Sequence, residues 1–221
     1  TLSNSGALPT TGFFEVENVT SGSNVNDTLS VEGETVWEVT ANNSVTVNGV
    51  SLSGIETLDG NDTDTLDYSA FGTAVTLNLT SATGNTGFTN ITGFVDVTGS
   101  ATAINTLTGD ANDNVLTGGA LNDTINGGAG DDILSGLAGN DTINGGADDD
   151  IISGGTGTNT LDGGLNTDTL SETEDANFLL IDNVSASIDA TLTIGSDASN
   201  LNAFEVISLS GGDSANTLNA S

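Results

Sequence analysis

Basic residues are entirely missing from this sequence. There is no lysine, arginine or histidine, while aspartate and glutamate together number 31 among 221 residues, so the formal net charge is −31 at pH 7. Proteins that bind nucleic acid or an anionic membrane surface do so largely through Lys and Arg. Neither is therefore an expected partner, and a cation from solution is the expected counter-charge. Oxygen-rich ligand sets of this kind favour calcium over transition metals.

Cysteine and methionine are also absent, so the chain can form no disulfide, thiolate nucleophile or zinc-finger site. No apolar run approaches the roughly 18 residues of a membrane-spanning helix, and no signal-peptide pattern opens the chain. We therefore expect no membrane insertion, and expect residue 1 to begin a mature chain or a fragment. With one proline, 30 glycines and no 3.6-residue apolar period, the sequence predicts an all-β fold.

Two simple explanations of the acidic composition stay open at this stage. High net charge with only 4% aromatic residues is typical of disordered chains. Against disorder, 35% of the residues are hydrophobic, and Val, Leu, Ile and Thr recur at regular intervals. The second explanation is a surface whose acidic residues serve only solubility.

A nine-residue repeat runs without a gap from residue 100 to residue 171. Its central windows, residues 127 to 153, are GGAGDDILS, GLAGNDTIN and GGADDDIIS. The eighth position is aliphatic in every window: Leu107, Leu116, Ile125, Leu134, Ile143, Ile152, Leu161 and Leu170. The sixth position is always Asn or Asp: Asn105, Asn114, Asp123, Asp132, Asp141, Asp150, Asn159 and Asp168. Chance does not produce two such columns together.

This repeat resembles the RTX calcium-binding nonapeptide GGxGxDxUx, in which U is a large aliphatic residue. The resemblance is close over residues 127–153 and weaker in the outer windows. It implies a right-handed parallel β-roll, or β-solenoid, in which a turn of about six residues precedes each strand of about three. Two nonapeptides form one coil of about 18 residues, and the eighth position points into the core.

The resemblance also implies Ca²⁺ sites between the turns of neighbouring coils. Glycine lets backbone carbonyl oxygens converge on an ion, and the sixth-position aspartate supplies charge. The strongest pairs are expected to be Asp123 with Asp141 and Asp132 with Asp150, and the weaker ones Asp141 with Asn159 and Asp150 with Asp168. The full set of expected site residues is Asp123, Asp132, Asp141, Asp150, Asp168, Asn159, Asn114, Gly127, Gly130, Gly136, Gly139 and Gly145.

Four exchanges depart from the family pattern, and we expect two to four occupied sites. Leu121 and Asp148 replace the fourth-position glycine, and Asn114 and Asn159 replace the aspartate. Asn and Asp can also cap a turn without any metal, which is the competing explanation. For residues 127–153 that explanation is weak, because carboxylates stacked at a strand spacing of about 4.8 Å repel one another.

The seventh position alternates with a period of 18 residues and should face outward, since the eighth faces inward. One side of the roll carries threonine (Thr106, Thr124, Thr142 and Thr160). The other carries an apolar stripe, which we define as Val115, Ile133 and Ile151. Branched residues suit strands wherever they point. The alternative is that the stripe is covered by another part of the chain or by a neighbouring copy.

We divide the chain into an irregular β-solenoid with β excursions (residues 1–99), the roll of eight nonapeptides (100–171), and an excursion with a return to solenoid strand (172–221). Short motifs near Phe14, Ile55, Phe94 and Phe204 are interpreted as places where the chain rejoins the solenoid. Segments such as 63–79 resemble parts of very large bacterial surface proteins and adhesins. Both ends resemble solenoid strand rather than caps, which suggests a fragment or a stacking subunit.

Three excursions are expected to form antiparallel strands: residues 34–52, with a hairpin at Asn48-Gly49, residues 74–94 and residues 177–194. Asp27, Asp64 and Asn216 precede Thr-Leu as Asn105 does, which leaves further calcium sites open. Trp37 and Tyr68 are expected to fill the ends of the core, with sugar stacking as the alternative.

No enzyme is expected, because paired carboxylates alone would have to carry the chemistry and the repeat already accounts for them. The predicted function is a calcium-stabilised structural module of a secreted, cell-surface bacterial protein or filament, docking laterally or end to end. Self-association would use Val115, Ile133 and Ile151. The alternative is an adhesin module that binds a glycan or another surface ligand through its excursions. Either could also assist secretion by folding only in the presence of external calcium.

Overall fold

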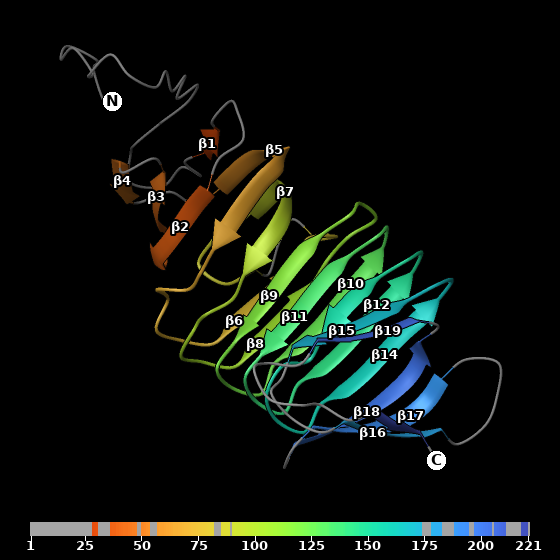
Figure 1. Cartoon of the computed structure of the whole chain (residues 1–221). Helices are drawn as coiled ribbons and strands as arrows, with labels where there is room; N and C mark the ends of the chain where they lie inside the picture. The colour runs from red at the N-terminus through yellow and green to blue at the C-terminus, as the bar shows by residue number, and fades with distance from the viewer. Residues whose placement is uncertain are drawn as a thin grey trace, which may run out of the picture.

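The computed structural model describes the chain as a stack of β-strands joined by turns (Figure 1). The described residues are 28–30, 36–47, 50–53, 57–81, 85–88, 90–173, 178–182, 188–194, 197–204, 206–210 and 218–220. Within these ranges there is no helix, and so none that could cross a membrane. Phe14, Asp27, Ile55, Asn216 and the Asn48-Gly49 turn lie outside the described residues.

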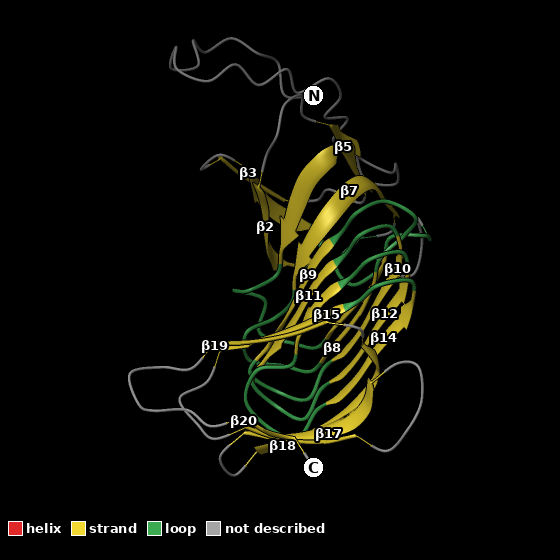
Figure 2. Cartoon of the chain, turned by 45° about the vertical axis from the view of Figure 1, so that its right-hand side comes forward, coloured by secondary structure: helices red, strands yellow, loops and turns green. Residues whose placement is uncertain are grey.

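Two sheets make up the stack, and the chain alternates between them through the repeats (Figure 2). Sheet 1 contains β1 (Thr28–Ser30), β2 (Val36–Ala41), β3 (Ser44–Val47), β4 (Val50–Ser53), β5 (Thr57–Asp67), β7 (Asn90–Thr98), β9 (Val115–Gly119), β11 (Ile133–Leu137), β13 (Ile151–Ser153), β15 (Thr169–Thr173) and β19 (Val206–Ser210). Sheet 2 contains β6 (Val75–Asn78), β8 (Asn105–Thr108), β10 (Thr124–Ala129), β12 (Thr142–Ala147), β14 (Thr160–Leu165), β16 (Phe178–Asp182), β17 (Ile188–Ile194), β18 (Asp197–Phe204) and β20 (Leu218–Ala220).

The pairing register confirms a parallel β-roll with an 18-residue coil. In sheet 2, Thr124 pairs with Thr142 and Thr142 with Thr160, all in parallel. In sheet 1, Ile133 pairs with Ile151 in the same way. Most strands of the repeat are longer than the expected three residues, because pairing continues through the glycines that open the next turn.

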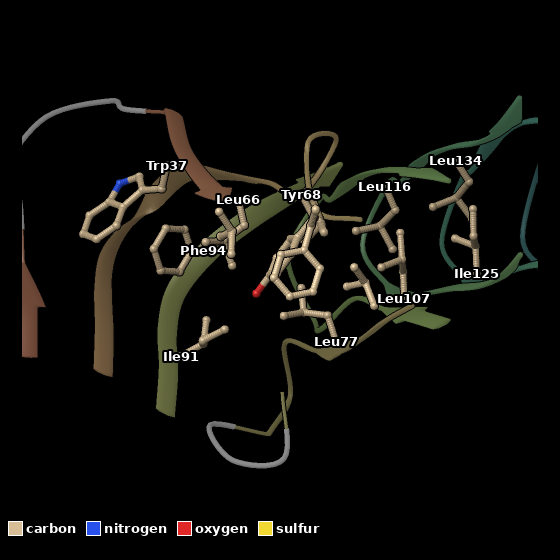
Figure 3. Close-up of a cluster of buried hydrophobic side chains, with 14 of the residues drawn as sticks. Trp37, Leu66, Tyr68, Leu77, Ile91, Phe94, Leu107, Leu116, Ile125 and Leu134 are labelled. Carbon is tan, nitrogen blue, oxygen red and sulfur yellow. The ribbon is translucent and has the colours of Figure 1, made fainter. Parts of the chain in front are cut away.

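The core is a double column of eighth-position side chains, all of them buried as predicted. The column continues beyond the repeat toward the N-terminus (Figure 3). In sheet 1, Leu116 pairs with Val97, Val97 with Leu66, and Leu66 with Trp37. In sheet 2, Leu107 pairs with Leu77. The core therefore extends to the N-terminal side of residue 100 through the pairing register of the strands and not through the repeat motif.

Aromatic residues fill this N-terminal part of the core. Trp37 and Tyr68 are both 0% exposed, which excludes them as sugar-stacking platforms and confirms that they fill the core. Tyr68 lies within the core, between Leu66 and Leu107, and not at its end as expected (Figure 3). Trp37 packs edge-to-face on Phe94 with ring centroids 5.1 Å apart, and Tyr68 packs likewise on Phe71 at 5.6 Å. The Tyr68 hydroxyl donates to the carbonyl oxygen of Thr86 at 2.8 Å, which satisfies its buried polar end.

The excursions were predicted correctly at both ends and wrongly in the middle. β2, β3 and β4 form antiparallel pairs, and so do β16, β17 and β18. In contrast, β6 lies within the predicted antiparallel segment 74–94 but pairs in parallel with β8. Leu77 continues the core column there, so burial made β6 a strand of the roll. At the predicted rejoining points, β7 pairs in parallel with β9 and β19 with β15.

A substitution in the core column should be far more costly than one on the next residue. Leu134 is 1% exposed and stacks between Leu116 and Ile152, while Ile133 points to solvent. We predict that Leu134→Ala lowers the free energy of unfolding by about 2–5 kcal/mol in saturating calcium. Ile133→Ala should cost less than about 1 kcal/mol. Urea unfolding followed by circular dichroism measures both, and equal losses would contradict the assigned faces.

Candidate metal centre

The turns of the roll form two stacked edges, which appear as green loops in Figure 2. We call edge I the turns that lead from sheet 1 to sheet 2: residues 118–123, 136–141 and 154–159. We call edge II the turns that lead from sheet 2 to sheet 1: residues 109–114, 127–132, 145–150 and 163–168. The predicted site residues are divided between the two edges, so the structure contains two separate columns of candidate sites.

The sixth-position side chains form a buried inner ladder along each edge. On edge II, Oδ1 of Asp132 accepts a hydrogen bond from the backbone N–H of Asn114 at 2.8 Å. Oδ1 of Asp150 accepts from the N–H of Asp132 at 2.9 Å, and Oδ1 of Asp168 accepts from the N–H of Asp150 at 2.9 Å. Each side chain thus ties its own coil to the preceding one, which is the turn-capping role that needs no metal.

The inner ladder of edge I follows the same pattern. Oδ1 of Asp123 accepts from the N–H of Asn105 at 2.6 Å, and Oδ1 of Asp141 accepts from that of Asp123 at 2.7 Å. At the next step the acceptor is Oδ1 of Asn159, which takes the N–H of Asp141 at 2.9 Å. All of these side chains are buried, so the acidic repeat is not merely a solubilising surface.

Capping uses only one oxygen of each carboxylate. The second oxygen, Oδ2, of Asp132, Asp141 and Asp150 is buried and has no hydrogen-bond partner. Asp123 differs, because its Oδ2 accepts from the N–H of Gly119 at 2.6 Å. A buried charged oxygen without a donor is strongly unfavourable. The three partnerless oxygens therefore require a group that the protein itself does not supply.

The first-position glycine of each turn lets these oxygens come close to a carbonyl oxygen of the next coil. A Cβ atom on Gly127 would sit 2.2 Å from Oδ2 of Asp132 and 2.6 Å from the carbonyl oxygen of Gly145 in the next coil. A Cβ atom on Gly145 would sit 2.2 Å from Oδ2 of Asp150 and 2.4 Å from the carbonyl oxygen of Gly163. Two acceptor oxygens from successive coils thus bracket one spot, and only glycine leaves it clear.

Edge I repeats this arrangement at two steps. A Cβ atom on Gly136 would lie 2.3 Å from Oδ2 of Asp141 and 2.8 Å from the carbonyl oxygen of Gly154. On Gly118 the corresponding distances, to Asp123 Oδ2 and the Gly136 carbonyl oxygen, are 2.5 and 2.9 Å. We call each such glycine, with its carboxylate and carbonyl oxygens, a cradle.

The asparagine replacements behave differently from one another. Near Gly109, Oδ1 of Asn114 and the carbonyl oxygen of Gly127 bracket the same kind of spot. Near Gly154, in contrast, the nearest atom is the amide nitrogen of Asn159, a donor. The step at Asn159 therefore does not present two oxygens to a cation.

The fourth-position glycines Gly130 and Gly139 serve the turn rather than the cradle. Their φ angles are +101° and +131°, and a Cβ on either would meet the backbone of the preceding coil at 2.6–2.7 Å. Asp148 takes the same place with φ of +80°, so the exchange preserves the left-handed conformation of the turn. The replacement of this glycine by Asp148 therefore does not open the turn.

A second ladder, at the fifth position, was missed by the sequence analysis. On edge II the N–H of Asp131 donates to Oδ1 of Asp113 at 2.9 Å, and the N–H of Asp149 donates to Oδ1 of Asp131 at 3.1 Å. On edge I the N–H of Asn140 donates to Oδ1 of Asn122 at 2.8 Å. We call this exposed row the outer ladder. The signal was present, because the fifth position is Asn or Asp in five successive windows.

Burial raises the pKa of each inner aspartate that lacks a partner for Oδ2. The pKa of Asp132 rises to about 7, and those of Asp141 and Asp150 rise to about 6. Desolvation is the largest cause in each case, and repulsion by other carboxylates adds to it. Without a cation, these side chains therefore take up protons at a higher pH than an ordinary aspartate does.

The cradles suit calcium better than a metal held by side chains alone. Among the described residues, no three Asp, Glu, His or Cys side chains come together as a metal cluster. The available donors are carboxylate oxygens with backbone carbonyl oxygens, which is the mixture that calcium takes in proteins. Buried oxygens without donors, glycines that leave the space clear, and an all-oxygen donor set all fit this ion.

A parallel β-roll with stacked, oxygen-lined turns belongs to the class of calcium-binding β-roll repeats. Comparison with protein families agrees: the family model of the RTX calcium-binding nonapeptide repeat (4 copies) matches residues 108–143 and 135–170. The roll of this chain is therefore built of RTX repeats, and RTX repeats bind Ca²⁺. They are typical of secreted proteins. No curated protein matches the chain.

The calcium-free roll should become less stable as the pH rises. The folded pKa values of about 7, 6 and 6 for Asp132, Asp141 and Asp150 exceed the ordinary 3.8. The folded state thus binds more protons between about pH 4 and 7, and loses this stabilisation as pH rises through that window. We predict that the chain in EDTA contains more β-structure at pH 5 than at pH 8, measured by far-UV circular dichroism, and that the difference is smaller for Asp132→Asn. A β-structure content that rises with pH in EDTA would refute this.

A methyl group placed in a cradle should push the two ligand oxygens out of position. Gly145→Ala puts its Cβ against Asp150 Oδ2 and the Gly163 carbonyl oxygen, and the φ of Gly145 lies outside the left-handed region. The effect is therefore steric, and we predict a loss of calcium affinity at that site of roughly tenfold or more. Gly72→Ala is the control, since nothing lies within 4 Å of its Cβ position. Calorimetric calcium titration of both variants checks this, and identical isotherms would exclude the cradle at Gly145.

Proposed function

We propose that this chain is a non-enzymatic structural module of an extracellular bacterial surface protein or fibre, and that calcium makes it rigid. The observation that carries the proposal is the row of cradles, in which a carboxylate oxygen lies near a carbonyl oxygen of the next coil. At Asp132, Asp141 and Asp150 that carboxylate oxygen is buried without a hydrogen-bond partner. Asp123, Asp132, Asp141 and Asp150 are the proposed carboxylate ligands, each with a glycine carbonyl oxygen of the next coil. When bound, calcium supplies the positive charge that the sequence lacks.

Binding of this kind would couple folding to the surroundings. Each cradle joins two successive coils, so it forms only when the coils are stacked, and ligand that binds only the folded state stabilises it. A chain without the ion keeps the repulsion between stacked carboxylates and only a thin core to oppose it. This supports a module that stays unfolded where calcium is scarce and folds after secretion.

Lateral docking is supported by a face that carries no charge. Residues 115–122, 133–140 and 151–158 contain β9, β11 and β13 of sheet 1 and most of edge I, and none of them is acidic. The apolar stripe lies on these strands with Val115 40%, Ile133 48% and Ile151 43% exposed. Two copies of a chain with a net charge of −31 repel each other least where acidic residues are absent, so this face with its apolar stripe is the proposed contact between neighbouring copies.

A calcium titration followed by far-UV circular dichroism and light scattering tests the proposal. We expect calcium, and not magnesium, to drive a coil-to-β transition, with scattering that rises in the same titration. The double variant Ile133→Thr/Ile151→Thr keeps β-branching and matches Thr169 in the same column. It should retain the transition and lose the scattering.

Three other results would each contradict part of this proposal or favour the alternative function. A folded chain indifferent to EDTA would refute the calcium-stabilised module. Scattering unchanged in the double threonine variant would refute the lateral contact. A monomer that binds glycans on an array would favour the adhesin module, whose contacts would then have to avoid the buried Trp37 and Tyr68. The division at residues 99 and 171 also stays a prediction, although both sheets extend through the described parts on either side of residue 100.

A further inference from the structure

We propose that the two edges of the roll bind calcium unequally, with edge II filling at lower calcium than edge I because only edge II carries a charged outer ladder. The inference rests on the proposed function, since it concerns the same cradles. It goes beyond that function by making the outer residues, which do not line the cradles, the determinants of the order in which the sites fill.

The outer ladders of the two edges make the same hydrogen bonds and differ in charge. Oδ1 of Asp113 on edge II and Oδ1 of Asn122 on edge I each accept the N–H of the next coil, at 2.9 and 2.8 Å. Further along, Asp149 and Asn140 accept in the same way from Thr167 and Thr158. The backbone is thus held equally on both edges, which isolates charge as the difference.

Other positions on edge II add to the same imbalance. Asp110 and Asp148 stand at the second and fourth positions of edge II turns. The nearest edge I equivalents are uncharged, namely Gly119 at the second position and Gly139 at the fourth. Neighbouring coils lie about 4.8 Å apart, which is less than the Debye length of about 8 Å at physiological salt, so aspartates on adjacent coils interact.

The outer residues are the direct sequence neighbours of the inner ladder. On edge II the residues that precede the sixth position of successive coils are charged, namely Asp113, Asp131 and Asp149. On edge I the corresponding residues are uncharged, namely Asn122, Asn140 and Thr158. A divalent cation relieves more repulsion where more carboxylates surround it, and the number of charges near a site tunes calcium affinity.

At both ends of edge I, hydrogen bonds already occupy carboxylate oxygens that could otherwise bind calcium. Toward the N-terminus, the N–H of Gly119 already occupies Oδ2 of Asp123 at 2.6 Å. Toward the C-terminus, the buried Glu172 side chain closes the edge, with Oε1 accepting from the N–H of Gly154 at 2.6 Å. Asp141 remains as the edge I residue with a partnerless oxygen, whereas edge II has both Asp132 and Asp150.

Exchanging the outer residues between the edges tests the proposal in the full chain. One variant, Asp113→Asn/Asp131→Asn/Asp149→Asn, removes the charge of the edge II outer ladder. The reciprocal variant, Asn122→Asp/Asn140→Asp, adds charge to edge I. Asn and Asp make the same backbone bond in this ladder, so both variants should fold. Calcium binding is measured by isothermal titration calorimetry at low and high salt.

The wild-type chain should bind calcium in two phases. Asp132→Asn should remove binding from the tighter phase and Asp141→Asn from the weaker one. The triple asparagine variant should weaken the tighter phase by roughly fivefold to tenfold, and the reciprocal variant should strengthen the weaker phase by a similar factor. Because the outer carboxylates are exposed, both effects should shrink as salt rises, which a purely structural role would not explain.

The outcomes separate this inference from the function on which it rests. No calcium binding by the wild-type chain would overturn the proposed function. Calcium binding whose isotherm does not change in either exchange variant would overturn the inequality of the edges and leave the proposed function intact. A tighter phase that is lost with Asp141→Asn instead of Asp132→Asn would reverse the assigned order and so contradict the inference.

Discussion

The structure depends on one electrostatic constraint: carboxylates are stacked and buried along each edge of the roll in a chain that has no basic side chain. One oxygen of each carboxylate ties its coil to the backbone of the coil before it. The other oxygen, at Asp132, Asp141 and Asp150, is left without a donor. Hydrogen bonds and ion binding are thus not competing explanations of the acidic repeat, because each uses a different oxygen of the same side chain.

Glycine connects this constraint to the backbone. At Gly127, Gly136 and Gly145 a side chain would occupy the space between a carboxylate oxygen and a carbonyl oxygen of the next coil. At Gly130 and Gly139 a positive φ lets the turn lie against the preceding coil. The same residue type therefore serves two purposes in one repeat, the close approach of two acceptor oxygens and the conformation of the turn. Asp148 occupies the second kind of position and adopts a positive φ of 80° itself.

The hydrophobic columns set how far the roll extends. Eighth-position side chains stack from Leu107 and Leu116 through the repeat, and the same columns continue into Leu77, Val97, Leu66 and Trp37, where no nonapeptide is recognisable. A strand joins the roll when it places an apolar side chain in register with this column. Turn chemistry is what distinguishes the calcium-binding part from the rest.

The sequence by itself determined the all-β class, the 18-residue coil, the inward eighth position and the stacking of sixth-position Asp and Asn along the turns. Each of these follows from a strict period that strand geometry translates into one face or one edge. Only the tertiary structure showed that β6 is a strand of the roll, because Leu77 is recognised as a core residue only from its pairing with Leu107. Only the structure separated Oδ1 from Oδ2, and placed the fifth-position Asp and Asn on different edges. These depend on contacts between residues one coil apart, which a one-dimensional pattern does not specify.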